Sequence, residues 1–558
     1  MFELLNNDFF IYAVTTSFLL SLVAAPLGVF LTLKRMSLMG DAISHSLLPG
    51  MALSLMIFGF STLGLLLGGL VAGLVVLGLM FWITEKSFLK DDSVLALIYL
   101  TLSSLGIILL SISDVKIDLM HFLFGNILLM PKEWIYLIAG SGILVLIGFS
   151  LIYKSLIQTI VDPEYSQFLK ISESRIKNIF YFLVLWVLIL SFYSVGTILA
   201  LGFLIIPAMI AKLFARAIKK QILLAAFFGW IISFTGILLS FEFNLPTGPS
   251  IILFGGLLFL TILPLQRFKK LMILVILCIP FNVKADSNSN IHGPRVLYSF
   301  SLLKSIGDEL LEGVTTQTLG VDSLIPAEKS IHSYSILPTD TVKLKSANLF
   351  FVIGLGFENF NISDMVKRFP TLKIVNLSEN IPYLKDKDPH IWNHPLNVIY
   401  ICKRILKELL LLLPEEKEKL NSNFKRFETS ILSLHRKYLK LFNEISLKQI
   451  IVSHNSFSYL GMAYQIDIFS PSGFASHDHA KPIELIQLRK LIEKNKKIPI
   501  FREESANNSY IEHLAKEAKI PISGTLNGES FSVSKDKKFR YQNYLLSNLE
   551  MIYRALEK

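Results

Sequence analysis

Apolar runs follow one another through the first 265 residues of this 558-residue chain, and only short charged loops separate them. About 20 apolar residues in a helix span the hydrocarbon core of a bilayer. With a window of that length we expect about nine membrane helices, near residues 9–33, 47–60, 62–83, 93–113, 133–153, 178–195, 197–213, 221–240 and 249–265. Residues 1–266 are therefore predicted to form an all-α polytopic membrane domain.

Basic residues are concentrated in alternate loops of this domain. If the expected helices alternate in direction, one side of the membrane carries the loops at 34–35, 86–90, 154–177, 212–220 and 267–270. Cytoplasmic loops carry an excess of Lys and Arg, so we place this side in the cytoplasm and the N-terminus outside. The same loops hold many of the charges behind the net charge of +11, and no nucleic-acid partner is expected.

Residues 267–290 form a segment of a different kind. Lys269 and Lys270 precede an apolar stretch, and the step Val283-Lys284-Ala285 follows it. This order is typical of a secretory signal peptide, here with a cleavage site after Ala285. By the alternation above, the segment runs from inside to outside, as an anchor helix or as a cleaved peptide. Residues 291–558 are therefore expected on the extracytoplasmic face.

The second half of the chain has the pattern of a soluble α/β domain. Short β-rich runs such as "RVLYSF", "LFFVIG" and "KQIIVSH" alternate with helical patterns, which predicts parallel sheets in two lobes. One long helix is predicted from Pro414 to about Ile445. Its apolar positions follow one stripe, made of Leu420, Phe424, Phe427, Ile431, Leu434, Tyr438 and Leu441. Such a helix would connect the two lobes as a rigid strut.

Histidines and carboxylates are the candidate metal ligands, because the only two cysteines, Cys278 and Cys402, exclude a Cys-based zinc site. His332, His390 and His454 lie in three separate blocks, and His454 ends the run "KQIIVSH". Ligands of α/β sheets bind beyond the carboxyl ends of strands. Three imidazoles with one carboxylate favour zinc over manganese or calcium. Each histidine alone also fits a structural role.

Asp41 and His45 form a polar pair between two apolar runs, in "MSLMGDAISHSLLPG". Residues four apart share one face of a helix, and ionisable groups at membrane depth are functional candidates by default. A carboxylate and an imidazole make a weak cation site, as a transport path requires. Alternatively, Asp41 caps a helix and His45 bonds a neighbouring helix. For a second pair, Asp118 and His121, loop packing is favoured.

Five blocks of the first half resemble a known family when they are taken together and in order: "LKRMSLMGDAISHSLLPGMAL", "DLMHFLFGNIL", "DPEYSQFLKIS", "VGTILALGFLIIPAMIAKLFA" and "NLPTGPSIIL". They are similar to the zinc/manganese-type permease subunits of ABC transporters. The resemblance implies a homodimeric permease in a bacterial inner membrane, coupled to a separate cytoplasmic ATPase through Asp162, Pro163 and Glu164. The chain has no G-x-x-x-x-G-K-[ST] motif for binding ATP phosphates, so ATP would act only through that partner.

The second half resembles the metal-binding proteins that feed zinc/manganese ABC importers, which are two-lobed and hold the metal between their lobes. The resemblance implies His332, His390 and His454 as three zinc ligands and Glu529 as the fourth, with water or Glu503 as alternatives. The loop "SGFASHDHAKP" suggests an auxiliary metal-capture site or, equally, a solvated polar loop; its residues are His477, Asp478 and His479. No such support exists for His292, His394 or His435.

These features together predict a natural fusion of permease and solute-binding protein, a component of an ATP-driven importer of a divalent transition metal. Zn²⁺ is the expected substrate, with Mn²⁺ or Fe²⁺ as the alternative. The chain is not expected to be an enzyme. A membrane-anchored zinc metalloenzyme is the alternative of another class, although the chain lacks an H-E-x-x-H motif. A metal sensor or metallochaperone that uses the permease half only as an anchor is a further alternative.

Overall fold

The computed structural model describes residues 8–37, 39–58, 62–87, 91–112, 127–130, 132–264, 294–314, 319–327, 331, 334–358, 362–385, 388–471, 482–504, 508–529 and 540–557. Contacts divide the chain into two compact units, one made chiefly of residues 1–288 and the other chiefly of residues 289–558. The signal-like segment with its cleavage site after Ala285 lies outside the described residues.

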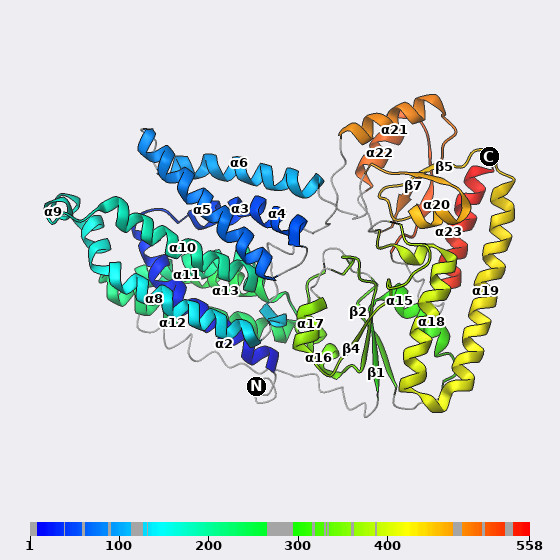
Figure 1. Ribbon diagram of the computed structural model, residues 1–558, viewed down its shortest axis with the longest axis horizontal. Coiled ribbons are helices and arrows are strands. Elements are labelled where there is room, and N and C mark those ends of the chain that lie inside the picture. Colours follow the sequence, from blue (N-terminus) through cyan, green and yellow to red (C-terminus); the bar gives the residue numbers. More distant parts are fainter. Residues whose placement is uncertain are drawn as a thin grey trace. The chain divides into compact units, whose positions relative to one another are not determined.

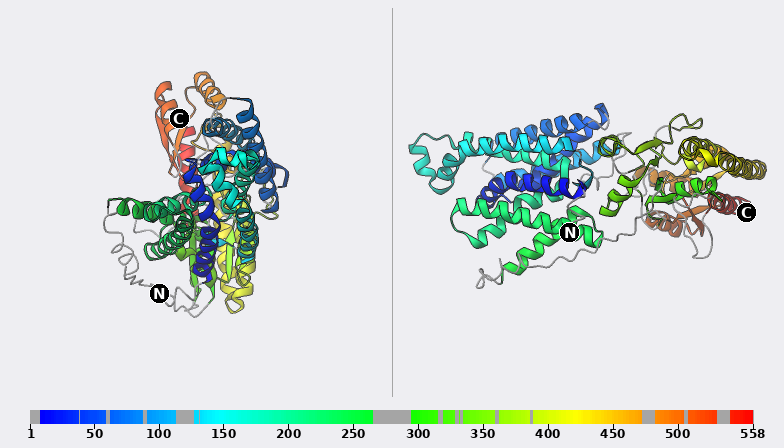
Figure 2. Two further views of the ribbon diagram at one scale, coloured as in Figure 1. Left: turned by 90° about the vertical axis from the view of Figure 1, so that its left-hand side faces the viewer. Right: turned by 90° about the horizontal axis from the view of Figure 1, so that it is seen from below.

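The first unit is entirely helical within the described residues, and its long helices run side by side (Figure 1, Figure 2). The helices are α2 (Asp8–Leu33), α3 (Met39–Ser46), α4 (Leu48–Phe58), α5 (Thr62–Lys86), α6 (Asp91–Ile112), α8 (Lys132–Val161), α9 (Pro163–Phe168), α10 (Glu173–Val195), α11 (Thr197–Phe214), α12 (Ile218–Phe243) and α13 (Thr247–Ile262), with a 3₁₀ turn η1 (Ile127–Leu129).

In its described residues, every segment expected to cross the membrane is mainly helical. In the described part of the chain, eight segments are long and apolar enough to cross a bilayer, with α3 and α4 together making one of them. The ninth, α13, is a shorter apolar helix of 16 residues. The all-α membrane class is therefore confirmed.

The segment around Asp41 differs from the prediction, which began a helix at residue 47. The chain is already helical at Met39 and breaks at Leu47, so that Asp41 and His45 lie on the separate short helix α3. Pro49 explains the break, because proline has no backbone N–H to donate to the carbonyl of the residue four positions earlier. The apolar composition of α4 did not indicate that a separate short helix, α3, precedes it.

Small residues allow the helices of this unit to approach closely. At the contact of α4 with α5, a Cβ on Gly50 would lie 2.2 Å from the Gly68 carbonyl oxygen, and a Cβ on Gly68 would lie 2.4 Å from the Gly50 carbonyl oxygen. No larger residue fits at either position without moving a backbone. This packing places α4 directly against α5.

The second unit contains two four-stranded parallel sheets, as the alternating pattern predicted. The first sheet has the order β2-β1-β3-β4, with strands β1 (Arg295–Phe300), β2 (Gly320–Ile325), β3 (Leu349–Val352) and β4 (Lys373–Asn376). Val296 pairs with Leu349 and Leu349 with Lys373. Along this part of the chain, α15 (Ser301–Leu310) belongs to the second unit, whereas the division by contacts assigns the first five residues of α16 (Pro338–Ser346) and all of α17 (Ile362–Arg368) to the first.

The second sheet has the order β6-β5-β7-β8, with β5 (Gln449–Ile451), β6 (Asp467–Phe469), β7 (Ile500–Glu503) and β8 (Ile522–Leu526). All of its pairings are parallel, and the register shifts between Ile500 and Phe501. The helices here are α20 (Ser458–Tyr464), α21 (Pro482–Lys494), α22 (Ser509–Ala518) and α23 (Tyr541–Leu556). A small core of buried aliphatic residues lies between this sheet and helices α21 and α22.

The two lobes are joined by η3 (Ile391–Asn393), α18 (Pro395–Leu412), η4 (Pro414–Glu416) and the long helix α19 (Lys417–Asn443). In Figure 1, α19 runs along both lobes, and it contacts α15 of the first lobe, the preceding connecting helix α18, and α20 and α23 of the second lobe. The predicted connecting helix is therefore confirmed, although it begins after a 3₁₀ turn at Pro414.

The buried stripe of α19 matches the prediction only in part. Leu420, Phe427, Ile431 and Tyr438 are buried as predicted. The other three expected positions, Phe424, Leu434 and Leu441, are only half-buried, and Asn423 and Phe442 are buried although they were not predicted to be. The Asn423 side chain can be buried because its amide donates to the carbonyl oxygens of Leu310 and Glu312, at 2.8 Å each.

Candidate metal centre

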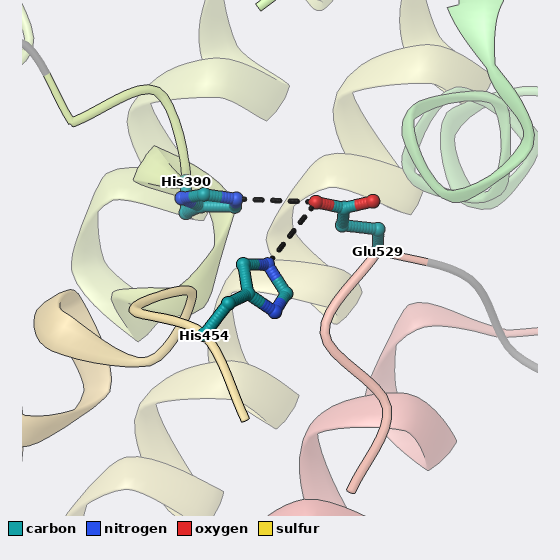
Figure 3. A group of neighbouring side chains, drawn as sticks. All are labelled: His390, His454 and Glu529. Atoms are coloured by element: carbon teal, nitrogen blue, oxygen red, sulfur yellow. Dashed lines mark hydrogen bonds and ion pairs between the residues drawn. The ribbon is translucent and has the colours of Figure 1, made fainter. Parts of the chain in front are cut away.

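His390, His454 and Glu529 converge on one point of the second unit, although they are distant in the sequence. One possible ligand atom from each lies within 4.8 Å of the others, and all three side chains are buried. Glu529 Oε1 lies 3.3 Å from Nε2 of His390 and 3.3 Å from Nε2 of His454. Figure 3 shows both rings directed at this oxygen.

The second sheet positions two of these residues. His454 follows strand β5 and Glu529 follows strand β8, and Glu503 is the last residue of the strand between them in the sheet, β7. Since the strands are parallel, their carboxyl ends meet at one edge, which is where α/β sheets bind ligands. His390 comes instead from the connection before η3.

A buried carboxylate orients the ring of His390. Asp388 Oδ1 lies 2.8 Å from His390 Nδ1 and also accepts the backbone N–H of His390 at 3.0 Å. The other oxygen of Asp388 accepts a hydrogen bond from the Ser458 hydroxyl. Carboxylates behind metal-binding histidines fix the tautomer in this way. With Nδ1 turned to Asp388, Nε2 of His390 is left to face Glu529.

Glu503 has the same relationship to His454. Its Oε2 lies 2.8 Å from His454 Nδ1, and its Oε1 accepts the backbone N–H of His454 at 2.8 Å. The Ser456 hydroxyl donates to Oε2 at 2.7 Å. Glu503, an alternative fourth ligand on sequence grounds, thus contacts the Nδ1 side of the ring, whereas Glu529 contacts the Nε2 side.

Nearby carboxylates raise the pKa of both histidines of the centre. Asp388 and Glu503 have exposed fractions of 0%, and Glu529 of 2%. Burial opposes a charge on His454, but the carboxylates of Glu503 and Glu529 outweigh it and raise the pKa of His454 to about 10. Burial likewise opposes a charge on His390, yet Asp388 and Glu529 raise its pKa.

This arrangement suits a divalent cation. Zinc bonds to nitrogen and oxygen of about 2.0–2.2 Å at tetrahedral angles place ligand atoms roughly 3.3–3.6 Å apart, and both Nε2–Oε1 distances agree with that spacing. A cation would also compensate the three buried carboxylates, which are costly to bury without a positive partner. The spacing and the charge of these residues are therefore compatible with a bound divalent cation.

Several predicted site residues lie outside the described residues. These are His332, one of the three expected histidine ligands, the loop residues His477, Asp478 and His479, the pair Asp118 and His121, and His292. Their assignments stay predictions.

Two other histidines of the second unit have contacts away from the centre. His394 stacks on Tyr383 with ring centroids 4.4 Å apart, and its Nδ1 accepts the backbone N–H of Leu396. Burial lowers the pKa of His394 to about 4. His435 lies on α19, where its Nδ1 is 3.2 Å from the Tyr464 hydroxyl. Both contacts are structural.

In the first unit, the structure brings Asp41 and His45 together on α3. His45 Nε2 lies 3.5 Å from Asp41 Oδ1, and the exposed fractions of the two side chains are 28% and 44%. The ring of His45 packs edge-on against Tyr99 of α6, with centroids 5.5 Å apart. The pair is thus formed and partly accessible.

The predicted coupling residues lie at the start of the short helix α9. Asp162 caps this helix by accepting the backbone N–H of Tyr165 at 2.9 Å, Pro163 occupies its first turn, and Glu164 is exposed. Tyr165 and Phe168 stack on each other with ring centroids 6.4 Å apart, and their exposed fractions are 50% and 81%. The helix presents an uncovered aromatic pair.

The contacts of Asp388 and Glu503 with the rings of His390 and His454 were not predicted from the sequence. Asp388 stands two positions before His390 in "DPHIW", and this spacing is the only signal that could have identified it. Glu503 was noticed only as a ligand, because its role depends on the neighbouring strands β5 and β7.

Comparison with known families divides the chain at the same place as its contacts. Residues 6–266 match the model of the ABC 3 transport family, and residues 296–555 match that of the zinc-uptake complex component A, periplasmic.

The first half is similar to permeases named for two different metals. It is 36% identical over 261 residues to the manganese import system permease protein ScaB of Streptococcus gordonii, which covers 46% of this chain and 92% of that protein. It is 32% identical over 274 residues to the high-affinity zinc uptake system membrane protein ZnuB of Haemophilus influenzae, covering 48% of this chain and 99% of that protein.

Solved structures similar to parts of the chain include PsaBC from Streptococcus pneumoniae in complex with Fab, at 33% identity, a TM-score of 0.43, and coverage of 48% of this chain and 99% of that one. A periplasmic metal binding protein from Candidatus Liberibacter asiaticus is 20% identical, with a TM-score of 0.43 and coverage of 47% and 99%.

Proposed function

Because this chain belongs to the ABC 3 transport family and continues into a zinc-uptake component A domain, we propose that it captures Zn²⁺ outside the cell and delivers it to its own permease. The observation that carries the proposal is the convergence of His390, His454 and Glu529 on one buried point. Two imidazoles and a carboxylate are ligands that zinc prefers. We assign His332 as the remaining ligand on the resemblance described above.

Capture and release would both depend on the carboxylates Asp388 and Glu503. They contact Nδ1 of the two histidines and leave Nε2 of each ring for the ion. The rings would therefore not have to reorient when the ion binds. Protons that enter the centre would compensate the same carboxylates after the ion has left. From there the ion would pass to Asp41 and His45, whose weak two-residue site permits release.

The transport cycle requires an ATPase subunit, since the chain has no phosphate-binding loop. We propose that α9 docks on this subunit at the cytoplasmic face of a bacterial inner membrane. Its exposed Tyr165 and Phe168 support this role, because large apolar groups without cover mark interaction sites. The permease would act as a homodimer within the lipid bilayer.

Fusion on one polypeptide would make docking of the capture domain intramolecular. Short flexible tethers give effective concentrations in the millimolar range, so the domain would meet its permease far more often than a free protein does. Cleavage after Ala285 would remove this advantage.

Manganese is the second candidate substrate, because several relatives of the permease half are named for manganese import. Iron import would use the same fold and path. The preference for zinc rests on His332 as a third histidine ligand, since manganese prefers more oxygen ligands.

The test is competitive metal binding by the full chain in lipid nanodiscs. Wild type is compared with His390→Ala/His454→Ala, with Asp41→Ala/His45→Ala, and with His513→Ala as an exposed control on α22. We expect tight zinc binding that only the first variant loses. Preference for manganese or iron would replace the substrate, and binding that survives His390→Ala/His454→Ala would refute the proposed centre.

A further inference from the structure

In the loop that carries Glu529, side chains form hydrogen bonds to the backbone groups of the two preceding residues, Asn527 and Gly528. The N–H of Asn527 donates to Asn548 Oδ1 at 2.9 Å, and Asn548 Nδ2 donates to the carbonyl oxygen of Asn527 at 2.8 Å. The carbonyl oxygen of Gly528 lies 2.7 Å from the Tyr544 hydroxyl and accepts from Trp392 Nε1 at 3.1 Å. Three main-chain groups directly before Glu529 are thus fixed by side chains.

Helix α23 supplies two of these side chains from one face. Tyr544 and Asn548 are four residues apart, and residues at this spacing are neighbours on a helix. Their exposed fractions are 0% and 1%. Buried polar groups require partners, and here the partners belong to the loop of Glu529. The helix is therefore a fixed support for this loop.

The same hydrogen bonds reach the segment of His390. The Tyr544 hydroxyl also lies 2.7 Å from Asn393 Oδ1, so its single proton is shared between two acceptors. Asn393 Nδ2 donates to the carbonyl oxygen of Ser456 at 2.8 Å, and the Tyr541 hydroxyl donates to the carbonyl oxygen of Trp392 at 2.6 Å. Trp392 and Asn393, which lie shortly after His390, are thereby hydrogen-bonded to helix α23 and to the segment that follows His454.

Gly528 completes this arrangement by its lack of a side chain. A Cβ at this position would lie 2.8 Å from Glu503 Oε2 and 2.9 Å from Ser456 Oγ. These two atoms belong to the group that orients His454. The backbone of the Glu529 loop thus passes directly beside Glu503 and Ser456, and a side chain at position 528 would displace them.

From these contacts we infer that Tyr544, Asn548 and Trp392 are positioning residues, which set the distance between Glu529 and the two histidines before a metal ion arrives. This inference rests on the proposed function and deepens it. A centre whose ligands are held in advance loses little freedom on binding. The ions that it holds best are therefore those whose bond lengths fit the fixed spacing of these ligands.

The test uses the full chain with Co²⁺, whose visible absorption bands report coordination geometry, and with Zn²⁺, whose dissociation is followed by transfer to a chelator. The variants are Tyr544→Phe, which removes only the shared hydroxyl, and Trp392→Phe, which keeps a ring but removes the N–H. Tyr553→Phe is the matched control on α23, because its hydroxyl bonds Glu557 at the surface. The signal of His390→Ala/His454→Ala is subtracted as the contribution of other sites.

We expect both variants to shift the Co²⁺ bands and to release Zn²⁺ about 10-fold faster or more, the range typical of residues that orient metal ligands, while the control behaves as wild type. Unchanged bands and release rates overturn the inference, even if the variants melt at a lower temperature, because the residues would then serve stability alone. If wild type holds no metal at this centre, the proposed function fails and the inference with it. If Tyr544→Phe does not fold, Trp392→Phe alone decides the outcome.

Discussion

Glu503 holds His454 from two directions. One carboxylate oxygen accepts the backbone N–H of His454 at 2.8 Å, and the other lies 2.8 Å from Nδ1 of its ring. Both side chains are buried, with exposed fractions of 0% and 1%. Glu503, at the end of the neighbouring strand, thus contacts both the backbone and the ring of this histidine.

Replacement of this carboxylate should weaken metal binding without removing a ligand. In Glu503→Gln, one amide oxygen can still accept the backbone N–H, but the amide NH₂ then faces Nδ1 of His454. The ring would adopt the tautomer that carries its proton on Nε2, where the metal must bind. We expect a 10- to 100-fold loss of zinc affinity, or about 1.4–2.7 kcal/mol, in competition with a chelator. Affinity equal to wild type would show that Glu503 does not orient the ligand.

Metal binding should release protons at neutral pH. With the pKa of His454 raised to about 10 and that of His390 also raised, His454 carries a proton before the ion binds and must lose it. The affinity should therefore rise with pH through the neutral range, about tenfold per unit for each proton displaced. Calorimetric titration in buffers of different ionisation enthalpy counts the protons. A count of zero at pH 7 would contradict the prediction.

The metal-free chain should show the opposite trend in stability. A folded pKa above the unfolded value of about 6.5 stabilises the fold fully at pH below 6.5, and this contribution is lost as pH rises toward 10. We therefore expect the free energy of unfolding of the capture domain to fall between pH 7 and pH 10. Denaturation of the metal-free full chain measures it, and saturation with Zn²⁺ should remove most of the slope. In His454→Ala the slope should be smaller.

Strand order explains how much of the centre could be predicted. The rule that ligands bind at the carboxyl ends of parallel strands made His454 a candidate, because it follows a clear β-rich run, and the structure places it at that edge of the second sheet. The role of Glu503 could not be derived, because it depends on β5 lying beside β7, and the sequence does not state which strands are neighbours. The roles of Tyr544 and Asn548 could not be derived either, because the sequence does not distinguish them from the other buried positions of the amphipathic helix α23.

Helix limits were predictable where composition changes and not where it stays apolar. The course of α19 followed from its spaced apolar residues and from Pro414. The break at Leu47 did not, because the residues after it are as apolar as those of other spans. In the same way, Asn423 was missed in the buried stripe, since its burial depends on two carbonyl groups at the end of α15.

The cap of α9 should matter for transport and not for metal capture. Asp162→Ala removes the acceptor for the backbone N–H of Tyr165, and loss of such a cap costs about 1 kcal/mol. Because α9 has only six residues, we expect a several-fold lower rate of metal uptake in cells, with zinc affinity unchanged. Asp162→Asn is the matched control, since asparagine caps as well as aspartate. Equal uptake by all three proteins would show that the cap is irrelevant to coupling.

The same substitution type distinguishes the two roles left open for Asp41. Asp41 lies in the first turn of α3, and its Oδ1 is 3.5 Å from Nε2 of His45. Asparagine keeps a helix-capping oxygen but not the charge, so Asp41→Asn should retain uptake if Asp41 only caps the helix. If the carboxylate contacts the passing ion, uptake should fall about tenfold or more, because a neutral amide is a much weaker cation ligand.

We expect this fall in uptake for Asp41→Asn and for His45→Gln, with zinc affinity of the capture domain unchanged in both. Zinc uptake into cells at equal protein levels measures the effect, and Asp41→Ala shows what loss of the cap adds. Wild-type uptake by Asp41→Asn beside a defect in Asp41→Ala would instead assign Asp41 a structural role.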